Sequence, residues 1–204
     1  MVKHIIFDIG NVLVGFDPDS YIKHFHFDPE KEKNIKSTVF GASVWKDLDR
    51  SIKPVSQLRE ELVSLARPEY HDDVLRVFDH SCGSVCRLDY AIPWIQDLQA
   101  QGFHTWYLSN YSFWMIERTK KALDFLPLMD GGLFSCESGW SKPEPQIFRA
   151  FLARCPQVVP EESVFFDDTP ANVEAARALG FHAIVFQNQA QAMRELQALV
   201  AQLA

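Results

Sequence analysis

Four groups of polar residues in this sequence carry side chains that could bind a phosphate group and a divalent cation. They are Asp8, Ser109-Asn110, Lys142 and Asp167-Asp168. Three of the groups come directly after short apolar runs, and Lys142 lies in a proline-containing loop ahead of a helical segment. Because the carboxyl ends of parallel strands form the ligand-binding edge of an open sheet, we expect all four groups to meet in one crevice.

The chemistry of these side chains is coherent. A carboxylate such as Asp8 can attack phosphorus and form an aspartyl-phosphate. Carboxylates from two strand ends, Asp8 and Asp168, can share Mg²⁺, which prefers oxygen ligands. Lys142 can neutralise phosphoryl oxygens, and the Ser109 hydroxyl can bind another. Phosphoryl transfer depends mainly on such positioning and charge neutralisation.

Strands must alternate with helices to place these groups. Apolar runs predict strands at residues 4–7, 103–108, 133–136, 164–166 and 181–186. Helical spacing predicts helices at 92–101, 113–123, 146–153, 171–179 and 189–203. This alternation indicates an α/β fold, a doubly wound parallel sheet with helices on both faces.

A long segment after the first strand has a different pattern. Beyond a brief extended piece at 12–14, Asp17 and Pro18 are suited to start a helix. Helices are also expected at 57–66 and 72–81, and no strand is expected in this segment. We therefore predict a small all-helical cap at residues 16–87 inserted into a core made of residues 1–15 and 88–204.

Four motifs in order resemble those of the haloacid-dehalogenase-like (HAD) hydrolase superfamily, in its capped subfamily. They are Phe7-Asp8-Ile9-Gly10-Asn11-Val12, Leu108-Ser109-Asn110, Ser141-Lys142-Pro143-Glu144-Pro145 and Phe166-Asp167-Asp168-Thr169-Pro170-Ala171-Asn172. The resemblance covers nearly the whole chain, and the last motif is the most specific. The Gly-Asn-Val form of the first motif especially resembles the bacterial branch of sugar-1-phosphate (alpha-D-glucose-1-phosphate) phosphatases.

The resemblance implies a role for each motif residue. Asp8 would be the nucleophile and a ligand of Mg²⁺, with Asp168 and the carbonyl of Gly10 as further ligands. Substrate phosphate would be bound by Ser109, Asn110 and Lys142, and Lys142 would also be catalytic. Asn172 would contact these residues and not the substrate, and Asp167 would have a supporting role.

One position departs from the family pattern. Most phosphatases of the family have a second Asp two residues after the nucleophile, serving as general acid and base, and this chain has Gly10 there. A general acid contributes about 10²–10⁴ in rate, so leaving groups of low pKa should suffer least from its loss. We therefore expect sugar-1-phosphates or aryl phosphates to be preferred over simple alkyl phosphates. Asp17 is one candidate replacement acid.

Two other functions are compatible with Gly10. A 2-haloacid dehalogenase also lacks the second Asp and needs no metal, although Asp168 offers this chain a metal ligand. A non-catalytic HAD-like binding protein is the other alternative. A receiver domain also holds Mg²⁺ with acidic residues and a Lys, but it has no helical insertion after its first strand.

Composition indicates which substrates, partners and cellular location to expect. The 204 residues carry a formal net charge of −7, which argues against nucleic acid as a partner and leaves a small phosphorylated metabolite as the expected substrate. No apolar run approaches the roughly 20 residues of a membrane span, so no membrane partner is expected. The four cysteines, without a secretion signal at the N-terminus, indicate reduced thiols and a cytoplasmic protein.

Overall fold

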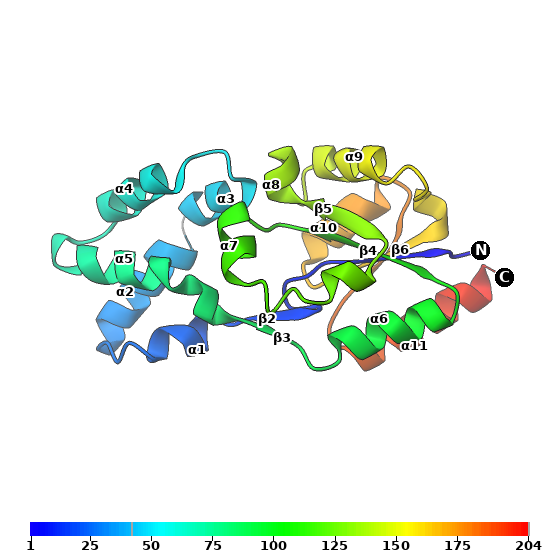
Figure 1. The fold of residues 1–204 in the computed structure, drawn as a ribbon, viewed down its shortest axis with the longest axis horizontal. Helices are drawn as coiled ribbons and strands as arrows, with labels where there is room; N and C mark the ends of the chain where they lie inside the picture. Colours follow the sequence, from blue (N-terminus) through cyan, green and yellow to red (C-terminus); the bar gives the residue numbers. More distant parts are fainter. Residues whose placement is uncertain (42, 204) are drawn as a thin grey trace.

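A five-stranded parallel sheet forms the centre of the protein (Figure 1). The computed structural model describes residues 1–41 and 43–203. The strands lie in the order β5-β4-β1-β6-β7, and each neighbouring pair is parallel. Their bounds are β1 His4–Phe7, β4 His104–Ser109, β5 Gly131–Phe134, β6 Ser163–Asp167 and β7 His182–Val185. This is the doubly wound α/β architecture that the sequence predicts.

The two faces of the sheet are covered by different pairs of helices. Ile5 and Phe7 of β1 pack into one buried cluster with α6 (Ala91–Ala100) and α11 (Gln189–Gln202). The intervening Ile6 packs on the opposite face with α9 (Pro145–Arg154) and α10 (Pro170–Arg177). Because every residue of β1 and β6 is buried, these strands read as nearly continuous apolar runs.

A helical insertion separates β1 from the rest of the sheet. Its helices are α1 Pro18–Lys23, α2 Pro29–Phe40, α3 Ser43–Arg50, α4 Val55–Leu65 and α5 His71–Asp79. They pack around an apolar cluster of their own, and in Figure 1 they lie at the end of the molecule away from the two termini. The chain enters and leaves this helical insertion through a short antiparallel pair, β2 Val14–Phe16 with β3 Val85–Arg87.

Several short elements complete the fold. Two helices lie near the carboxyl ends of β4 and β5, namely α7 Phe113–Arg118 and α8 Ser135–Ser138. The single-turn 3₁₀ helices are η1 Pro68–Tyr70, η2 Ser81–Ser84, η3 Leu126–Leu128 and η4 Pro160–Glu162. Within residues 1–41 and 43–203, no helix is both long enough and apolar enough to cross a membrane. The four cysteines are free thiols, as expected.

Some predicted boundaries are wrong. β3 lies in the segment where no strand is expected, and residues 12–13 form a turn ahead of β2. The strand predicted at 133–136 ends at Phe134, where the chain turns directly into α8, and the Glu137 carboxylate accepts the Phe134 N–H at 2.9 Å. The helix predicted at 113–123 ends at Arg118, with turns after it.

Candidate active site

The functional side chains meet at the carboxyl edge of the three central strands. Asp8 directly follows β1, Ser109 ends β4, and Asp167 ends β6. Since β4, β1 and β6 are neighbours in the sheet, residues far apart in sequence come together. The Asp8 N–H donates to the Phe166 carbonyl at 2.8 Å, which extends the β1–β6 pairing to the first residue of the site.

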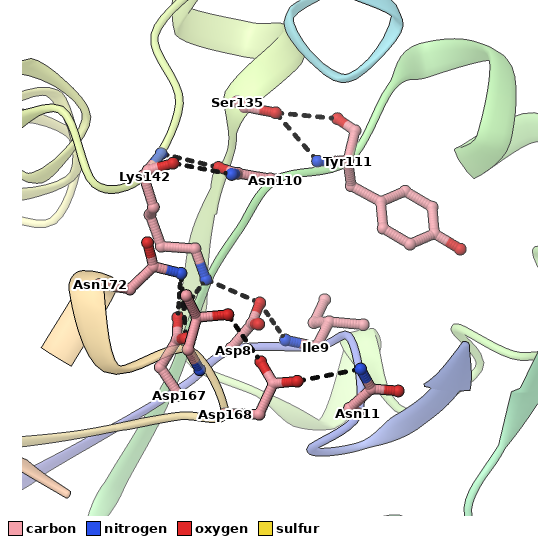
Figure 2. A network of polar contacts seen from close by, with 11 residues as sticks. Asp8, Ile9, Asn11, Asn110, Tyr111, Ser135, Lys142, Asp167, Asp168 and Asn172 are labelled. Carbon is pink, nitrogen blue, oxygen red and sulfur yellow. Dashed lines mark hydrogen bonds and ion pairs between the residues drawn. The ribbon is translucent and has the colours of Figure 1, made fainter. Parts of the chain in front are cut away.

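Lys142 joins the two carboxylates of this edge (Figure 2). Its Nζ lies 2.8 Å from Asp8 Oδ1 and 2.7 Å from Asp167 Oδ2, and only 1% of its side chain is exposed. A buried ammonium is costly unless it is paired and hydrogen-bonded. Both conditions are met here, so Lys142 fixes the relative position of Asp8 and Asp167.

Asp167 is held from three directions. Its carboxylate accepts the Asn172 amide at 3.0 Å on both oxygens and the Thr169 N–H at 2.8 Å on Oδ1, in addition to Lys142 on Oδ2. It is fully buried. With its acceptor capacity used by these donors, Asp167 acts by orienting Lys142, and Asn172 acts by orienting Asp167.

Asn110 holds the loop that carries Lys142. Its side-chain oxygen accepts the Lys142 N–H at 2.8 Å, and its side-chain nitrogen donates to the Lys142 carbonyl at 3.0 Å. The sequence predicts that Asn110 binds phosphate, whereas the structure places both of its polar atoms on the backbone of Lys142. Both residues nevertheless line the same cavity as Asp8 and Ser109.

The pKa values of the pair follow from burial and charge. Burial raises the pKa of Asp8, the Lys142 ammonium lowers it, and the nearby Asp167 raises it again, giving about 6. Burial lowers the pKa of Lys142, but the two carboxylates outweigh burial and leave that pKa above its ordinary value. At neutral pH the site therefore holds an ionised Asp8 beside a charged Lys142.

Three carboxylates at this edge could hold a metal ion. Asp8, Asp167 and Asp168 each offer an oxygen, and these oxygens lie within 4.8 Å of one another. Asp168 Oδ2 accepts the Asn11 side-chain amide at 2.9 Å, and Oδ1 accepts the Thr169 hydroxyl at 3.2 Å. Because Asp167 is already satisfied by Lys142, Asn172 and Thr169, Asp8 and Asp168 are the better placed ligands. Such a set of hard oxygen donors suits Mg²⁺.

The cavity above this edge is shared with the helical insertion. Asp8, Gly10, Ser109 and Lys142 line it from the sheet, and five further lining residues, Val14, Phe16, Trp45, Asp49 and Val85, come from the helical insertion and its stem. Burial and the negative charge of Asp8 raise the pKa of Asp49 well above its ordinary value.

Ser135 connects the helical insertion to the core beside the cavity. The Ser135 hydroxyl donates to the Asp49 carbonyl at 2.5 Å and accepts the Tyr111 N–H at 2.9 Å. Figure 2 shows Ser135 beside Tyr111, just beyond the end of β4. Close by, Arg50 Nε donates to the Gly139 carbonyl at 2.8 Å. The end of α3 is therefore attached to the core beside the active-site loops.

Asp17 is not in this site. It is exposed and accepts the Ser20 N–H at 2.9 Å, and this hydrogen bonding lowers its pKa. It serves as the N-cap of α1, the other role that its place before Pro18 indicates. Asp17 is absent from the described lining of the active-site cavity, so the structure does not favour it as a replacement acid.

Asn11, Thr169 and Ser135 contact residues of the site, although their positions in the sequence predict no role for them. Asn11 has a signal in hindsight, because its φ of 56° is one that Asn tolerates, and a Gly-Asn pair after a strand marks such a turn. Thr169 follows the acidic pair directly. Ser135 has no local signal, because its partner Asp49 lies 86 residues away.

The fold and this cluster define a hydrolase class. The model of the haloacid dehalogenase-like hydrolase family matches residues 2–180. The chain belongs to the haloacid dehalogenase-like hydrolase family, and it is an enzyme. The resemblance inferred from the four motifs is therefore confirmed.

A curated relative and two solved structures match nearly the whole length of the chain. D-ribitol-5-phosphate phosphatase of Bacteroides thetaiotaomicron is 24% identical, over 96% of this chain and 97% of that protein. A HAD-like hydrolase of Porphyromonas gingivalis has a similar fold, with a TM-score of 0.73, 24% identity and coverage of 97% and 98% of the two chains. A HAD-family enzyme of Bacteroides thetaiotaomicron, solved with magnesium and inorganic phosphate, also has a similar fold. Its TM-score is 0.71 and its identity 19%, and the match covers 93% of this chain and 96% of that chain.

Proposed function

We propose that this protein is a magnesium-dependent phosphomonoester hydrolase that acts on a small phosphorylated metabolite through an aspartyl-phosphate on Asp8. One observation carries the proposal: the Lys142 ammonium bridges Asp8 and Asp167, and an oxygen of Asp168 lies within 4.8 Å of oxygens of both carboxylates. A carboxylate nucleophile, a buried cation and a second carboxylate for a metal are the groups that phosphoryl transfer needs.

The residues of the site have different roles in this reaction. With a pKa of about 6, Asp8 is ionised at neutral pH and can attack phosphorus with one oxygen while Lys142 holds the other. Lys142 and the Ser109 hydroxyl neutralise and bind phosphoryl oxygens. Mg²⁺, held by Asp8, Asp168 and the Gly10 carbonyl, would supply further charge neutralisation. Asn110, Asn172 and Asp167 keep Lys142 in place.

We propose a phosphorylated sugar or sugar alcohol as the substrate. The active-site cavity has a volume of about 220 Å³, below the range of about 300–1,000 Å³ found for drug-sized ligands. A full-length relative is named for a sugar-alcohol phosphate. An alcohol of that kind is a poor leaving group, which makes the source of its proton the central question for this site.

The helical insertion would act as a cap over the substrate. We propose a core domain of residues 1–15 and 88–204 and a cap domain of residues 16–87. Support comes from the separate apolar cluster of the helical insertion, from the β2–β3 stem, and from Trp45 and Asp49, which line the cavity together with residues of the strand edge. Closure of such a cap excludes water from the reaction.

The test is hydrolysis of p-nitrophenyl phosphate and a panel of sugar and polyol phosphates with Mg²⁺. We expect turnover that is lost in EDTA and restored by excess Mg²⁺, and a fall of at least about 10⁴-fold in Asp8→Asn. Retained activity in Asp8→Asn would refute the proposed nucleophile. Dehalogenation of a 2-haloacid at an unchanged rate in EDTA would favour the hypothesis of a dehalogenase. Zero turnover of every ester would favour a binding protein.

A further inference from the structure

The leaving alcohol needs a proton, and the position two residues after Asp8 does not supply one. Gly10 carries no side chain, and a Cβ built on it meets no atom within 4 Å. The space that a general acid would occupy beside Asp8 is therefore open. A proton donor for an alkyl leaving group must come from another residue that lines the cavity.

The described residues lining the cavity include five titratable ones, and four of these already have another role or a hydrogen-bond partner. They are Asp8, Asp49, Tyr111, Lys142 and Asp168. Asp8 is the nucleophile, and Lys142 is shared by two carboxylates. Asp168 is a metal ligand that accepts a hydrogen bond from the Asn11 side-chain amide. The Tyr111 hydroxyl is hydrogen-bonded to Thr119 at 2.7 Å, and burial raises its pKa to about 12. Asp49 is the one that remains.

We propose that Asp49, on α3 of the helical insertion, is the catalytic general acid that protonates the leaving oxygen and then the base that activates water. This inference rests on the proposed phosphatase function. It assigns to the helical insertion a chemical step that the first motif of this chain cannot perform.

The position of Asp49 supports this role. Asp8 lines the cavity from the end of β1 in the sheet, and Asp49 lines it from the helical insertion. In an in-line displacement the leaving oxygen lies on the side of phosphorus opposite the nucleophile. A donor that lines the cavity from a different element than Asp8 is compatible with this geometry.

The backbone around Asp49 is anchored to the core. Its carbonyl accepts the Ser135 hydroxyl, and the next residue, Arg50, donates to the Gly139 carbonyl. These bonds hold the backbone of Asp49 beside the core and use neither oxygen of its carboxyl group. Burial and the charge of Asp8 also raise its pKa well above the ordinary value, which favours the protonated carboxyl that a donor requires.

The proposed steps balance. In the first, an Asp8 oxygen forms a bond to phosphorus, the bond from phosphorus to the alcohol oxygen breaks, and that oxygen takes the Asp49 proton. In the second, water attacks phosphorus, the bond from phosphorus to Asp8 breaks, and the Asp49 carboxylate takes the proton of the water. The products are alcohol, inorganic phosphate and the starting enzyme.

The experiment compares leaving groups in Asp49→Asn. With Mg²⁺, kcat should fall about 10²–10⁴-fold on a polyol phosphate, whose alkoxide needs a proton. On p-nitrophenyl phosphate the first step should change less than about 10-fold, because p-nitrophenolate leaves without one; the burst of p-nitrophenolate reports this step separately from water attack. Asp47→Asn is the matched control, since Asp47 lies on the same helix and pairs with Lys53 instead of lining the cavity.

A rescue variant separates chemistry from folding. Gly10→Asp places a carboxyl group into the open space beside Asp8, and it should restore polyol phosphate turnover in the Asp49→Asn background. Equal losses in the first step on both esters, or no loss on either, would overturn the role of Asp49. Failure of the proposed function is distinct, because the wild-type protein would then release no p-nitrophenolate at all.

Discussion

The strand-edge cluster and the helical insertion are held by different kinds of interaction. We define the strand-edge cluster as Asp8, Lys142, Asp167 and Asp168. Its central ion pairs join side chains that are 10% exposed or less. The helical insertion carries its ion pairs nearer the surface, for example Arg59 with Asp79 at 36% and 38% exposure.

The difference separates a rigid, buried polar cluster from a helical insertion whose ion pairs lie nearer the surface. Each buried group of the strand-edge cluster has several partners, so its geometry is determined several times over. Exposed ion pairs contribute little to stability, and α3 of the helical insertion reaches the core through a small number of hydrogen bonds such as Ser135 to Asp49. Substitutions at the surface of the helical insertion should therefore disturb the strand-edge cluster little.

Lys142→Met should have the largest effect on stability. It removes the only cation that the described structure pairs with both Asp8 and Asp167, and two buried carboxylates are left together. Removing one partner of a buried ion pair costs about 3–5 kcal/mol. Urea denaturation in EDTA would measure the fall in the free energy of unfolding.

The matched control for Lys142→Met lies in the helical insertion. Lys53 also pairs with two carboxylates, those of Asp47 and Glu61, but its side chain is 30% exposed. Lys53→Met should leave the urea midpoint nearly unchanged. Similar shifts for the two variants would break the contrast between the regions.

Asn11→Gly should weaken Mg²⁺ binding without slowing the saturated enzyme much. The Asn11 amide orients Asp168, and loss of such an outer partner typically costs 10–100-fold in metal affinity. Glycine accepts the positive φ of residue 11, so the backbone is not strained. A Mg²⁺ titration of activity would show the shift, and an unchanged half-saturating concentration would argue against Asp168 as a ligand.

The central fold could be predicted because its signals are local. β1 and β6 are buried apolar runs that end in acidic residues, and periodic helices follow. The β2–β3 pair was missed because three residues are too few to show alternation and the partners are about 70 residues apart. The turn from β5 into α8 was missed because Ser135 and Cys136 are compatible with a strand.

The site could be predicted in part for the same reason. Asp8, Ser109, Asp167 and Asp168 all lie at or just after the end of a strand, and parallel strands bring their ends together. The bonds from Asn110 to the Lys142 backbone and the place of Asp49 on the cavity wall depend on tertiary packing. Periodicity and spacing carry no information about either.

Asp8→Asn should make the metal-free protein relatively more stable as the pH rises. The folded-state pKa of Asp8 is about 6, above the ordinary 3.8, mainly because of burial. Its favourable contribution is complete below the unfolded pKa and is lost as the pH rises through the folded pKa. Asparagine cannot ionise, so the variant should gain about 1 kcal/mol on wild type between pH 5 and pH 7.5.

The measurement for Asp8→Asn is urea denaturation in EDTA at the two pH values. Added Mg²⁺ should stabilise the wild type more than the variant, since the ion binds the ionised carboxylate. A stability difference that does not change with pH would mean that the strand-edge cluster does not disfavour the charged form of Asp8.

Asp17→Ala tests the helical insertion and should give the smallest effect. Asp17 caps α1 through the Ser20 N–H and lies at the surface. Loss of an N-cap should lower the melting temperature by about 1–4 °C, whereas kcat on polyol phosphates should stay within about twofold of wild type. Asp17→Asn keeps the cap and should restore the melting temperature. A selective loss of turnover with alkyl leaving groups in both variants would move the proton donor from α3 to the start of α1, and it would make the first turn of the helical insertion part of the chemistry.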